Sequence, residues 1–461
     1  PGLGPRKAQQ REYALGISGL NIRSRCPTVP GMNVLFIFSD QQRRDALGCM
    51  GNPDVDTPNL DALARRGVLF RRAYTADPIC TPYRGSLMTG QYTSRCGVVR
   101  NCDPLPEGTT TLADAFNAGG YATAFVGKWH LGSKGNKPIP PGLRGGFRQF
   151  IGYQCYNGFY KDVCFYDEDG AEHRFDRHRT DVTTDIAIER LEDLAGAPFM
   201  LTVAYQAPHY PEQPAPEFEA LYRGRELHPR PCTREVDPFT PTFSPPSPRP
   251  LDRDADNRRY GNDLAEYTRL YNAMCTQIDA NVGRLLDALE RLGLARDTAV
   301  FYTSDHGDMQ GDHGLKNKCL PHEGSAGVPL IAYVPGSPGG RVSDGLVTTP
   351  DFMPTCLELA GLPAVATTDG HSFASFLRGE GPAPGGPVFS ERPGKWAMIV
   401  EGSWKLVADR TDDGLIPSLM IHAPDDPYEL DNRVADDAVA DVRCRLLAEL
   451  EAWEADVTRT A

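Results

Sequence analysis

The sequence predicts an α/β protein with a large, mostly parallel sheet covered by helices on both faces, followed by a smaller C-terminal α+β subdomain with a short antiparallel sheet. Short, wholly apolar runs alternate with amphipathic helical segments, which is typical of a parallel sheet buried on both sides. Near residue 377 this alternation ends in a Gly- and Pro-rich stretch. We therefore expect an N-terminal extension at 1–30, a main domain at 31–377 and a C-terminal subdomain at 378–461.

The main domain opens with an expected strand at 33–39, which is apolar throughout and ends at Asp40. A helix at 57–66 follows, with Thr57 as its N-cap and Pro58 in its first turn. The other expected strands are residues 68–74, 121–126, 199–205, 298–303 and 328–334. The other expected helices are residues 111–118, 181–194, 264–292 and 351–360. This order of strands and helices places both ends of the main domain in one sheet.

Two further segments depart from that alternation. Residues 208–260 are rich in proline and show no periodicity, so we expect an insert that is either a functional loop or disordered. The C-terminal subdomain should contain short strands at 397–400 and 404–408 and an amphipathic helix at 438–457.

Composition excludes some classes of protein. Lys and Arg number 48 against 61 Asp and Glu, so a net charge of −13 argues against a nucleic-acid binder. The 12 cysteines form no C-x-x-C pair, and we expect mostly reduced thiols. No run reaches the ~20 apolar residues of a membrane span. Residues 1–30 contain no apolar signal core, so the default location is cytoplasmic; because the chain begins at Pro1, a periplasmic or secreted location stays open.

Polar side chains stand at the ends of two widely separated strands. Asp40 and Gln41 follow the first strand, and Asp305 and His306 follow the strand at 298–303. Ligands collect at the carboxyl ends of strands in such sheets, so these groups should converge. Three oxygen donors and one imidazole suit Ca²⁺, Mg²⁺ or Mn²⁺. The sequence therefore predicts one divalent metal ion, most simply Ca²⁺.

Several motifs resemble those of one family. Cys80-Thr-Pro-Tyr-Arg84 resembles the maturation motif of the type I, formylglycine-dependent sulfatases of the alkaline phosphatase superfamily. Other segments resemble the family's metal-binding, G-K-W-H-x-G and P-H-x-P segments and its distal lysine, and they occur in family order at residues 39–43, 56–64, 127–132, 207–211, 304–307, 311–315 and Lys318. The chain is identified on these residues as a member of that family, and the resemblance implies an alkaline phosphatase-like fold.

The resemblance implies a chemistry centred on Cys80. A separate formylglycine-generating enzyme would oxidise it to an aldehyde, whose hydrate has two hydroxyls. One would contact the metal ion and attack sulfur, and deprotonation of the other would expel sulfate. This makes position 80 both the nucleophile and a metal ligand, and it divides one difficult step into two.

The resemblance also assigns roles to charged residues. Arg84 would neutralise developing charge beside the diol, while Lys128 and Lys318 would hold the sulfate oxygens. His130 would be the base that collapses the intermediate. A lysine outside such motifs is normally an exposed solubilising charge, and only the motif context favours function here.

Further residues would act on the substrate. His209, together with Lys318, would protonate the leaving oxygen, and Asn101 would hydrogen-bond the diol or the sulfate. His322 and Glu323 could face the substrate or be structural, with neither alternative favoured. Four aromatic residues could stack on a sugar or simply pack in the core: Phe147, Tyr153, Tyr156 and Trp396.

Departures from the family pattern leave alternatives open. Gln41 stands where the commonest family pattern has a second Asp. In this respect the chain resembles the phosphonate monoester hydrolase branch of the family. The first hypothesis is a hydrolase of sulfate monoesters on a small or terminal sulfated carbohydrate. The second is a phosphonate monoester or phosphodiester hydrolase with the same site, and the third is a catalytically silent binding protein with unmodified Cys80. The negative body should repel long polyanionic substrates. Nothing in the sequence indicates a membrane or nucleic-acid partner, and the oligomeric state stays open.

Overall fold

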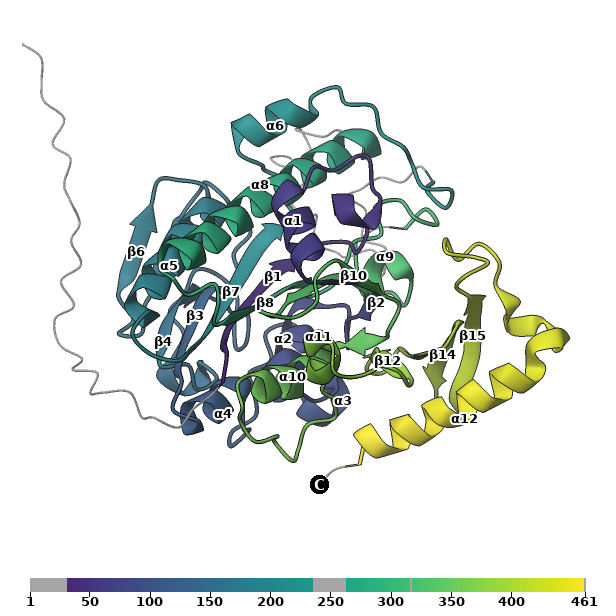
Figure 1. The fold of residues 1–461 in the computed structure, drawn as a ribbon. Helices are drawn as coiled ribbons and strands as arrows, with labels where there is room; N and C mark the ends of the chain where they lie inside the picture. Colours follow the sequence, from purple (N-terminus) through teal and green to yellow (C-terminus); the bar gives the residue numbers. More distant parts are fainter. Residues whose placement is uncertain (1–30, 235–262, 316, 460–461) are drawn as a thin grey trace, which may run out of the picture.

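The computed structural model describes residues 31–234, 263–315 and 317–459 (Figure 1). The expected N-terminal extension at 1–30 and the later part of the expected insert, from residue 235 on, lie outside the described residues. The described part of the insert includes the short helix α6 (Pro216–Tyr222). Among the described residues, no helix is both long and apolar enough to cross a membrane.

An 11-stranded sheet runs through the described part of the main domain, in the order β10-β2-β9-β8-β1-β7-β3-β4-β5-β6, with β11 paired to β2. Its strands are β1 (Asn33–Asp40), β2 (Val68–Tyr74), β3 (Ala122–Lys128), β4 (Gln149–Tyr153), β5 (Val163–Tyr166), β6 (Glu172–Phe175), β7 (Phe199–Pro208), β8 (Thr298–Ser304), β9 (Gly327–Tyr333), β10 (Arg341–Ser343) and β11 (Val347–Thr348). The centre, β8-β1-β7-β3-β4, is parallel, while β9, β5 and β6 pair antiparallel with their neighbours. The expected large, mostly parallel sheet is confirmed.

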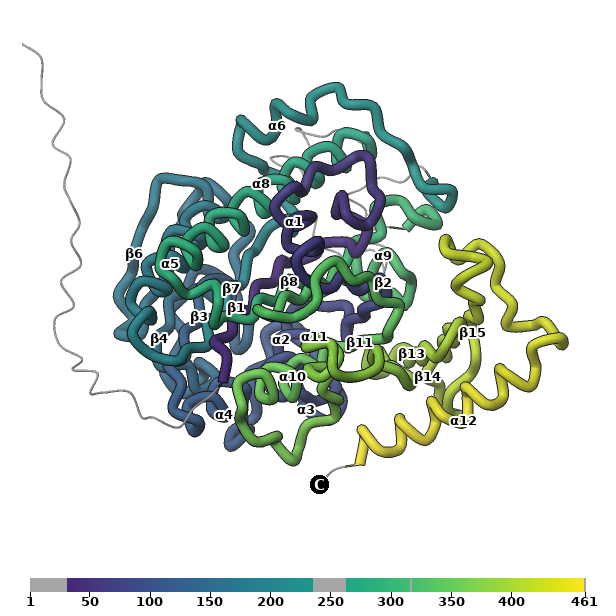
Figure 2. Tube along the Cα trace, viewed as in Figure 1, coloured from purple at the N-terminus to yellow at the C-terminus, as the bar shows by residue number. Residues whose placement is uncertain are grey.

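Both faces of this sheet are covered by helices, as expected for a parallel centre (Figures 1 and 2). The helices of the main domain are α1 (Pro58–Arg66), α2 (Cys80–Thr89), α3 (Thr93–Cys96), α4 (Leu112–Ala118), α5 (Arg179–Leu194), α6, α8 (Leu264–Arg291), α9 (Glu323–Ala326), α10 (Phe352–Leu359) and α11 (Ala374–Arg378). Phe36 and Phe38 of β1 pack with the core under α2, α4 and α10, while Leu35 and Ile37 pack with α1, α5 and α8. The alternating side chains of one strand thus belong to two cores.

A second, antiparallel sheet forms the C-terminal subdomain, which stands beside the main domain in Figure 1. Its strands are β12 (Val388–Arg392), β13 (Trp396–Glu401), β14 (Trp404–Thr411) and β15 (Gly414–His422), and α12 (Ala440–Val457) packs across it. The strands expected at 397–400 and 404–408 lie in β13 and β14. The outer strands β12 and β15 escape sequence reasoning because they are only partly buried and lack a clear alternation.

Candidate active site

The ends of four parallel strands converge on one buried carboxylate. Asp40 is the last residue of β1, and Asp305 follows β8, whose Ser304 lies beside Ser39 in the sheet. The Asp305 amide donates to the Ser39 carbonyl at 3.1 Å, which holds the two strand ends together. Lys128 ends β3 and His209 follows β7. The sheet therefore brings together, at one edge, side chains that lie as far apart in the sequence as Asp40 and Asp305, as expected.

A glycine permits this close approach at Lys128. Gly127 has φ +115°, and a Cβ at this position would lie 2.1 Å from the carbonyl oxygen of Ala204 in β7. Only glycine allows β3 to lie this close to β7 just before the lysine. This explains the glycine of the Gly127-Lys128-Trp129-His130 segment.

Three cations surround Asp40 and Cys80. Lys128 Nζ lies 2.7 Å and Arg84 Nη2 3.0 Å from Asp40 Oδ2. Burial would raise the pKa of Asp40, but the charge of Lys128, with those of Lys318 and Arg84, outweighs it and holds this pKa well below its usual value. Asp40 is therefore an ionised carboxylate with almost no solvent exposure, stabilised by cations.

Cys80 is the first residue of α2 and is only 1% exposed. Its Sγ lies 3.2 Å from Lys318 Nζ, 3.3 Å from His306 Nε2 and 3.5 Å from Asp40 Oδ1. Burial, and then the negative charge of Asp40, raise the pKa of the thiol to about 12. The unmodified side chain is thus a protonated thiol near pH 7, which is a poor nucleophile.

The described residues contain one cluster suited to a metal ion. Asp40, Cys80, Asp305 and His306 are all buried, and one donor atom of each lies within 4.8 Å of the others. Burial, and then the nearby Asp40, raise the pKa of Asp305 to about 7, so ionising the second carboxylate of this pair is costly without a bound cation. The carboxylate oxygens of Asp40 and Asp305 are hard donors, and a divalent cation between them would satisfy both.

Gln41 lies at the border of this cluster. Its backbone has φ +70°, and its amide nitrogen donates to Asp305 Oδ1 at 2.9 Å. Its side chain donates to Asp308 at 2.7 Å, while its Oε1 accepts from Lys318 at 3.0 Å. Coordination by this oxygen stays a prediction. Asp308 escaped sequence reasoning because an acidic loop residue is normally solvated, yet it is buried and also accepts from Tyr267.

His130 and Asn101 both lie against the start of α2. Thr81 Oγ1 donates to the His130 carbonyl at 2.7 Å, and the Thr81 amide donates to Asn101 Oδ1 at 3.2 Å. Asn101 thus accepts from the helix amide next to Cys80, and its hydrogen bond to the diol or the sulfate stays a prediction. Burial and the nearby Lys128 lower the pKa of His130 well below its usual value, so the ring is neutral and able to accept a proton.

His209 and Lys318 differ in the proton each holds. His209 Nε2 lies 4.0 Å from Asp40 Oδ1, and its Nδ1 lies 2.7 Å from the Tyr210 carbonyl, which assigns the proton of the neutral ring to Nδ1. Burial and then Lys318 lower the pKa of His209. Burial would lower the pKa of Lys318, but Cys80 and Asp40 outweigh it and raise this pKa. Lys318 therefore carries a proton here, and the protonation of the leaving oxygen by His209 with Lys318 stays a prediction.

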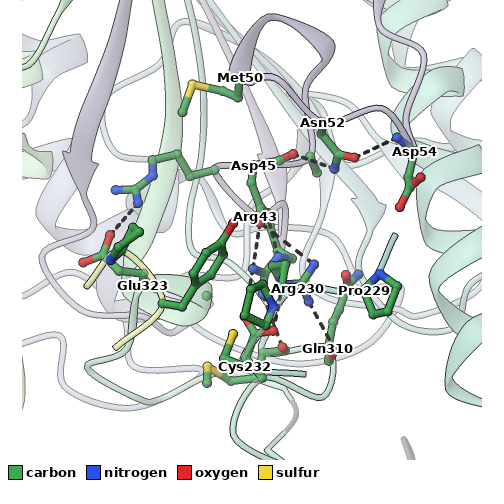
Figure 3. Close-up of a pocket in the computed structure, with 18 of the residues that line it drawn as sticks. Arg43, Asp45, Met50, Asn52, Asp54, Pro229, Arg230, Cys232, Gln310 and Glu323 are labelled. Atoms are coloured by element: carbon green, nitrogen blue, oxygen red, sulfur yellow. Dashed lines mark hydrogen bonds and ion pairs between the residues drawn. The ribbon is translucent and has the colours of Figure 1, made fainter. Parts of the chain in front are cut away.

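A cavity of about 470 Å³ is lined by residues that follow the two metal-site segments in sequence, among them Arg43 and Gln310, while Asp40 and Cys80 do not line it (Figure 3). Its wall includes Arg43, Arg44 and Arg230, and each is paired with a carboxylate within 2.9 Å. The wall therefore offers balanced charge, unlike the cation-rich cluster at Asp40. Glu323 belongs to this wall and is held by Arg44, Lys405 and Tyr74, which favours a structural role for it.

Three of the four aromatic candidates for sugar stacking are buried. Phe147 and Tyr153 pack against other aromatic rings, and Trp396 is 6% exposed with its Nε1 bonded to the Cys319 carbonyl. Tyr156 keeps partial exposure. Phe147, Tyr153 and Trp396 therefore pack in the core rather than offering a face to a sugar.

Comparison with known proteins agrees with these observations. The family model described as Sulfatase matches residues 32–362, more than half of the chain. The ulvan-active sulfatase of Formosa agariphila is 31% identical over 77% of this chain and 66% of its own length. The N-acetylglucosamine-6-O-sulfatase of Bacteroides thetaiotaomicron is 27% identical over 76% of this chain and 72% of its own length.

The fold is also similar to that of a solved phosphonate monoester hydrolase. The phosphonate monoester hydrolase of Agrobacterium radiobacter superposes with a TM-score of 0.74 at 25% identity, covering 92% of this chain and 96% of that one. The expected family, fold class and enzyme class are confirmed. A family model spanning the strand ends that carry Asp40, Lys128 and Asp305 leads to one conclusion: the chain belongs to the sulfatase family, a family of sulfuric ester hydrolases.

Proposed function

We propose that this protein hydrolyses the sulfate monoester of a small or terminal sulfated carbohydrate. The observation that carries the proposal is the convergence of Arg84, Lys128 and Lys318 on Asp40 and Cys80, because it forms a buried cationic cluster in a chain of net charge −13. Such a cluster attracts one sulfate group while the acidic surface disfavours a long polyanion. The names of the two relatives, a sulfatase active on ulvan and one acting on N-acetylglucosamine, support a sugar as the alcohol.

The proposed cofactors are one divalent metal ion and a formylglycine derived from Cys80. Asp40, Asp305 and His306 would hold the ion together with residue 80 and the side-chain oxygen of Gln41, and the oxygen-rich set favours Ca²⁺ over Mg²⁺ or Mn²⁺. The ion would neutralise sulfate charge and lower the pKa of a bound oxygen. Formylglycine would replace a thiol that burial keeps protonated.

The side chains then divide the reaction into two steps. The hydrated aldehyde at position 80 would supply one deprotonated oxygen to bond to sulfur, its proton passing to solvent. Lys318 would protonate the alcohol oxygen as the bond between that oxygen and sulfur breaks. In the second step His130 would take the proton of the remaining hydroxyl, so that the carbonyl re-forms and the bond from carbon to sulfate breaks. Water would then hydrate the aldehyde again after sulfate leaves. Arg84 and Lys128 stabilise the negative charge throughout.

Metal removal tests the cofactor assignment. Chelation is expected to reduce sulfate release at least about 10-fold, because the two carboxylates and the sulfate would then share one pocket without the cation. Adding Ca²⁺ should restore turnover, and Mg²⁺ and Mn²⁺ serve as comparisons. Full activity in protein shown by elemental analysis to be metal-free would contradict the assignment.

A substrate panel tests the reaction class. The neutral Gln41 and the likeness to a phosphonate monoester hydrolase favour that activity as the second candidate. We expect kcat/KM for sulfated mono- and disaccharides to exceed that for a phosphonate monoester or a phosphodiester, and to exceed that for intact sulfated polysaccharide. Preferred turnover of the phosphonate would establish the second candidate. No release from any ester by protein with confirmed formylglycine would favour a binding protein.

A further inference from the structure

The C-terminal sheet contacts the segment that carries Lys318. Trp396, the first residue of β13, donates its indole N–H to the Cys319 carbonyl at 3.1 Å. The Cys319 amide donates in turn to the Pro78 carbonyl at 3.1 Å, two residues before Cys80. The indole therefore bonds the residue that follows Lys318, and the amide of the same residue bonds the loop that leads into Cys80.

This segment needs outside support. Asn317 and Cys319 flank Lys318, and both adopt left-handed backbone conformations, with φ of +67° and +76°. Such conformations are unfavourable for residues other than glycine, so the surrounding contacts have to maintain them. Asp308 accepts from the Asn317 amide at 3.1 Å on one side, and Trp396 bonds Cys319 on the other. Lys318 is thus fixed between the metal-site loop and the C-terminal sheet.

The neighbouring residue of the same hairpin holds the nucleophile loop. Arg392, paired with Trp396 across β12 and β13, donates to Asp77 Oδ2 at 3.2 Å and to the Val99 carbonyl at 2.8 Å. Asp77 lies three residues before Cys80, and Val99 lies two before Asn101. The hairpin end therefore contacts the chain on two sides of the active site.

The hairpin end is itself held rigidly. Arg410 of β14 donates to the carbonyls of Arg392 and Trp396 at 2.9 and 2.7 Å. The same guanidinium donates to Glu454 of α12 at 2.8 Å. A continuous set of hydrogen bonds thus connects α12 through the hairpin to the segments of Lys318 and Cys80.

We propose that Trp396 and Arg392 are positioning residues, through which the C-terminal subdomain sets the geometry of Lys318 and of the residue 80 nucleophile. The proposal rests on the proposed function for the role of Lys318 in the reaction. Trp396 acts through the backbone of Cys319 and touches neither sulfate nor alcohol. The C-terminal subdomain is then part of the catalytic apparatus, because geometry errors near 1 Å at reacting groups lower rates strongly.

The test is a double-mutant cycle between Trp396 and Lys318. Trp396→Phe keeps an aromatic ring and removes the N–H donor, and we expect kcat/KM for a sulfated sugar to fall about 10-fold. Lys318→Ala should lower it further, and adding Trp396→Phe to Lys318→Ala should then change it by less than about 2-fold. Trp404→Phe, at a half-buried tryptophan of the same sheet, is the matched control and should leave activity within about 2-fold. Equal losses in both backgrounds, or no loss, would overturn the proposal.

Hydrogen exchange provides a readout that needs no turnover. In Trp396→Phe, amides of residues 317–320 should exchange faster, while those of the central sheet stay unchanged. In Arg392→Met, faster exchange should appear at residues 76–80, and this variant serves if Trp396→Phe folds poorly. Unchanged exchange in both would overturn the proposal. Absence of sulfate release from the wild-type protein would overturn the proposed function instead and would leave the exchange result interpretable.

Discussion

Replacing Cys80 by Ala is expected to lower kcat/KM for sulfate release by at least about 10⁴-fold, because it removes the group that forms the covalent intermediate. Cys80 stands where Asp40, His306 and Lys318 converge, so no neighbouring side chain can take its place. The measurement is sulfate release from a sulfated sugar by enzyme whose formylglycine content is known from mass spectrometry of the peptide around residue 80.

A serine variant separates the nucleophile from the second hydroxyl. In Cys80→Ser, with residue 80 verified as serine, one oxygen is present and the diol is absent. We expect at most one alcohol released per chain and a stable sulfate ester on residue 80, since no second hydroxyl can expel the sulfate. Alanine at position 80 with wild-type turnover would contradict the mechanism, as would repeated turnover by the verified serine variant.

Replacing Lys405 by Met is expected to destabilise the protein by about 3–5 kcal/mol, because it leaves the buried Glu429 without its cation and removes one of the two cations that pair with Glu323. Lys405 is 2% exposed and pairs with Glu429 at 2.6 Å and with Glu323 at 3.1 Å. Glu323 belongs to the main domain and Lys405 to the C-terminal sheet. The substitution should therefore weaken the contact between the main domain and this sheet. Chemical denaturation at neutral pH measures it, with the exposed Lys395→Met as the matched control, which should change stability little.

The size of that loss should depend on pH. Burial would raise the pKa of Glu323, but Lys405 and Arg44 outweigh it and lower this pKa to about 2. A carboxyl with a depressed pKa stabilises the fold above its unfolded value of about 4.3, and this contribution is lost as pH falls from there toward 2. The stability difference between wild type and Lys405→Met should therefore be largest above pH 5 and shrink below pH 4. A difference independent of pH would contradict the ionised pairing.

The sequence allowed the central sheet and the main site residues to be predicted, for a physical reason. A strand buried on both faces has to be wholly apolar, and the polar residue that ends it then stands out, as Asp40 and Asp305 do. Lys128 and Arg84 were predicted only through their resemblance to family motifs, and the structure places both beside Asp40.

Other features could not be read from the sequence. Helix α2 carries Cys80, yet Pro82 and Gly85 lie inside it and all of its residues are buried, so neither propensity nor periodicity indicates a helix. Trp396 looked equally suited to sugar stacking and to packing, and only its bond to the Cys319 carbonyl decides this. The burial of Asp308 depends on Gln41 and Tyr267, which are remote from each other in the chain.

The burial of Cys80 has a consequence for biosynthesis. A modifying enzyme has to reach residues 80–84, but in the folded protein Cys80 and Arg84 are each only 1% exposed, beneath the segments around Lys318 and Asp305. If Cys80 is converted as we propose, the conversion has to precede the folding of those later segments over it. Slower synthesis of the chain beyond residue 300 would lengthen this interval, and faster spontaneous folding would shorten it. The yield of modified protein would then be set by a race between two rates.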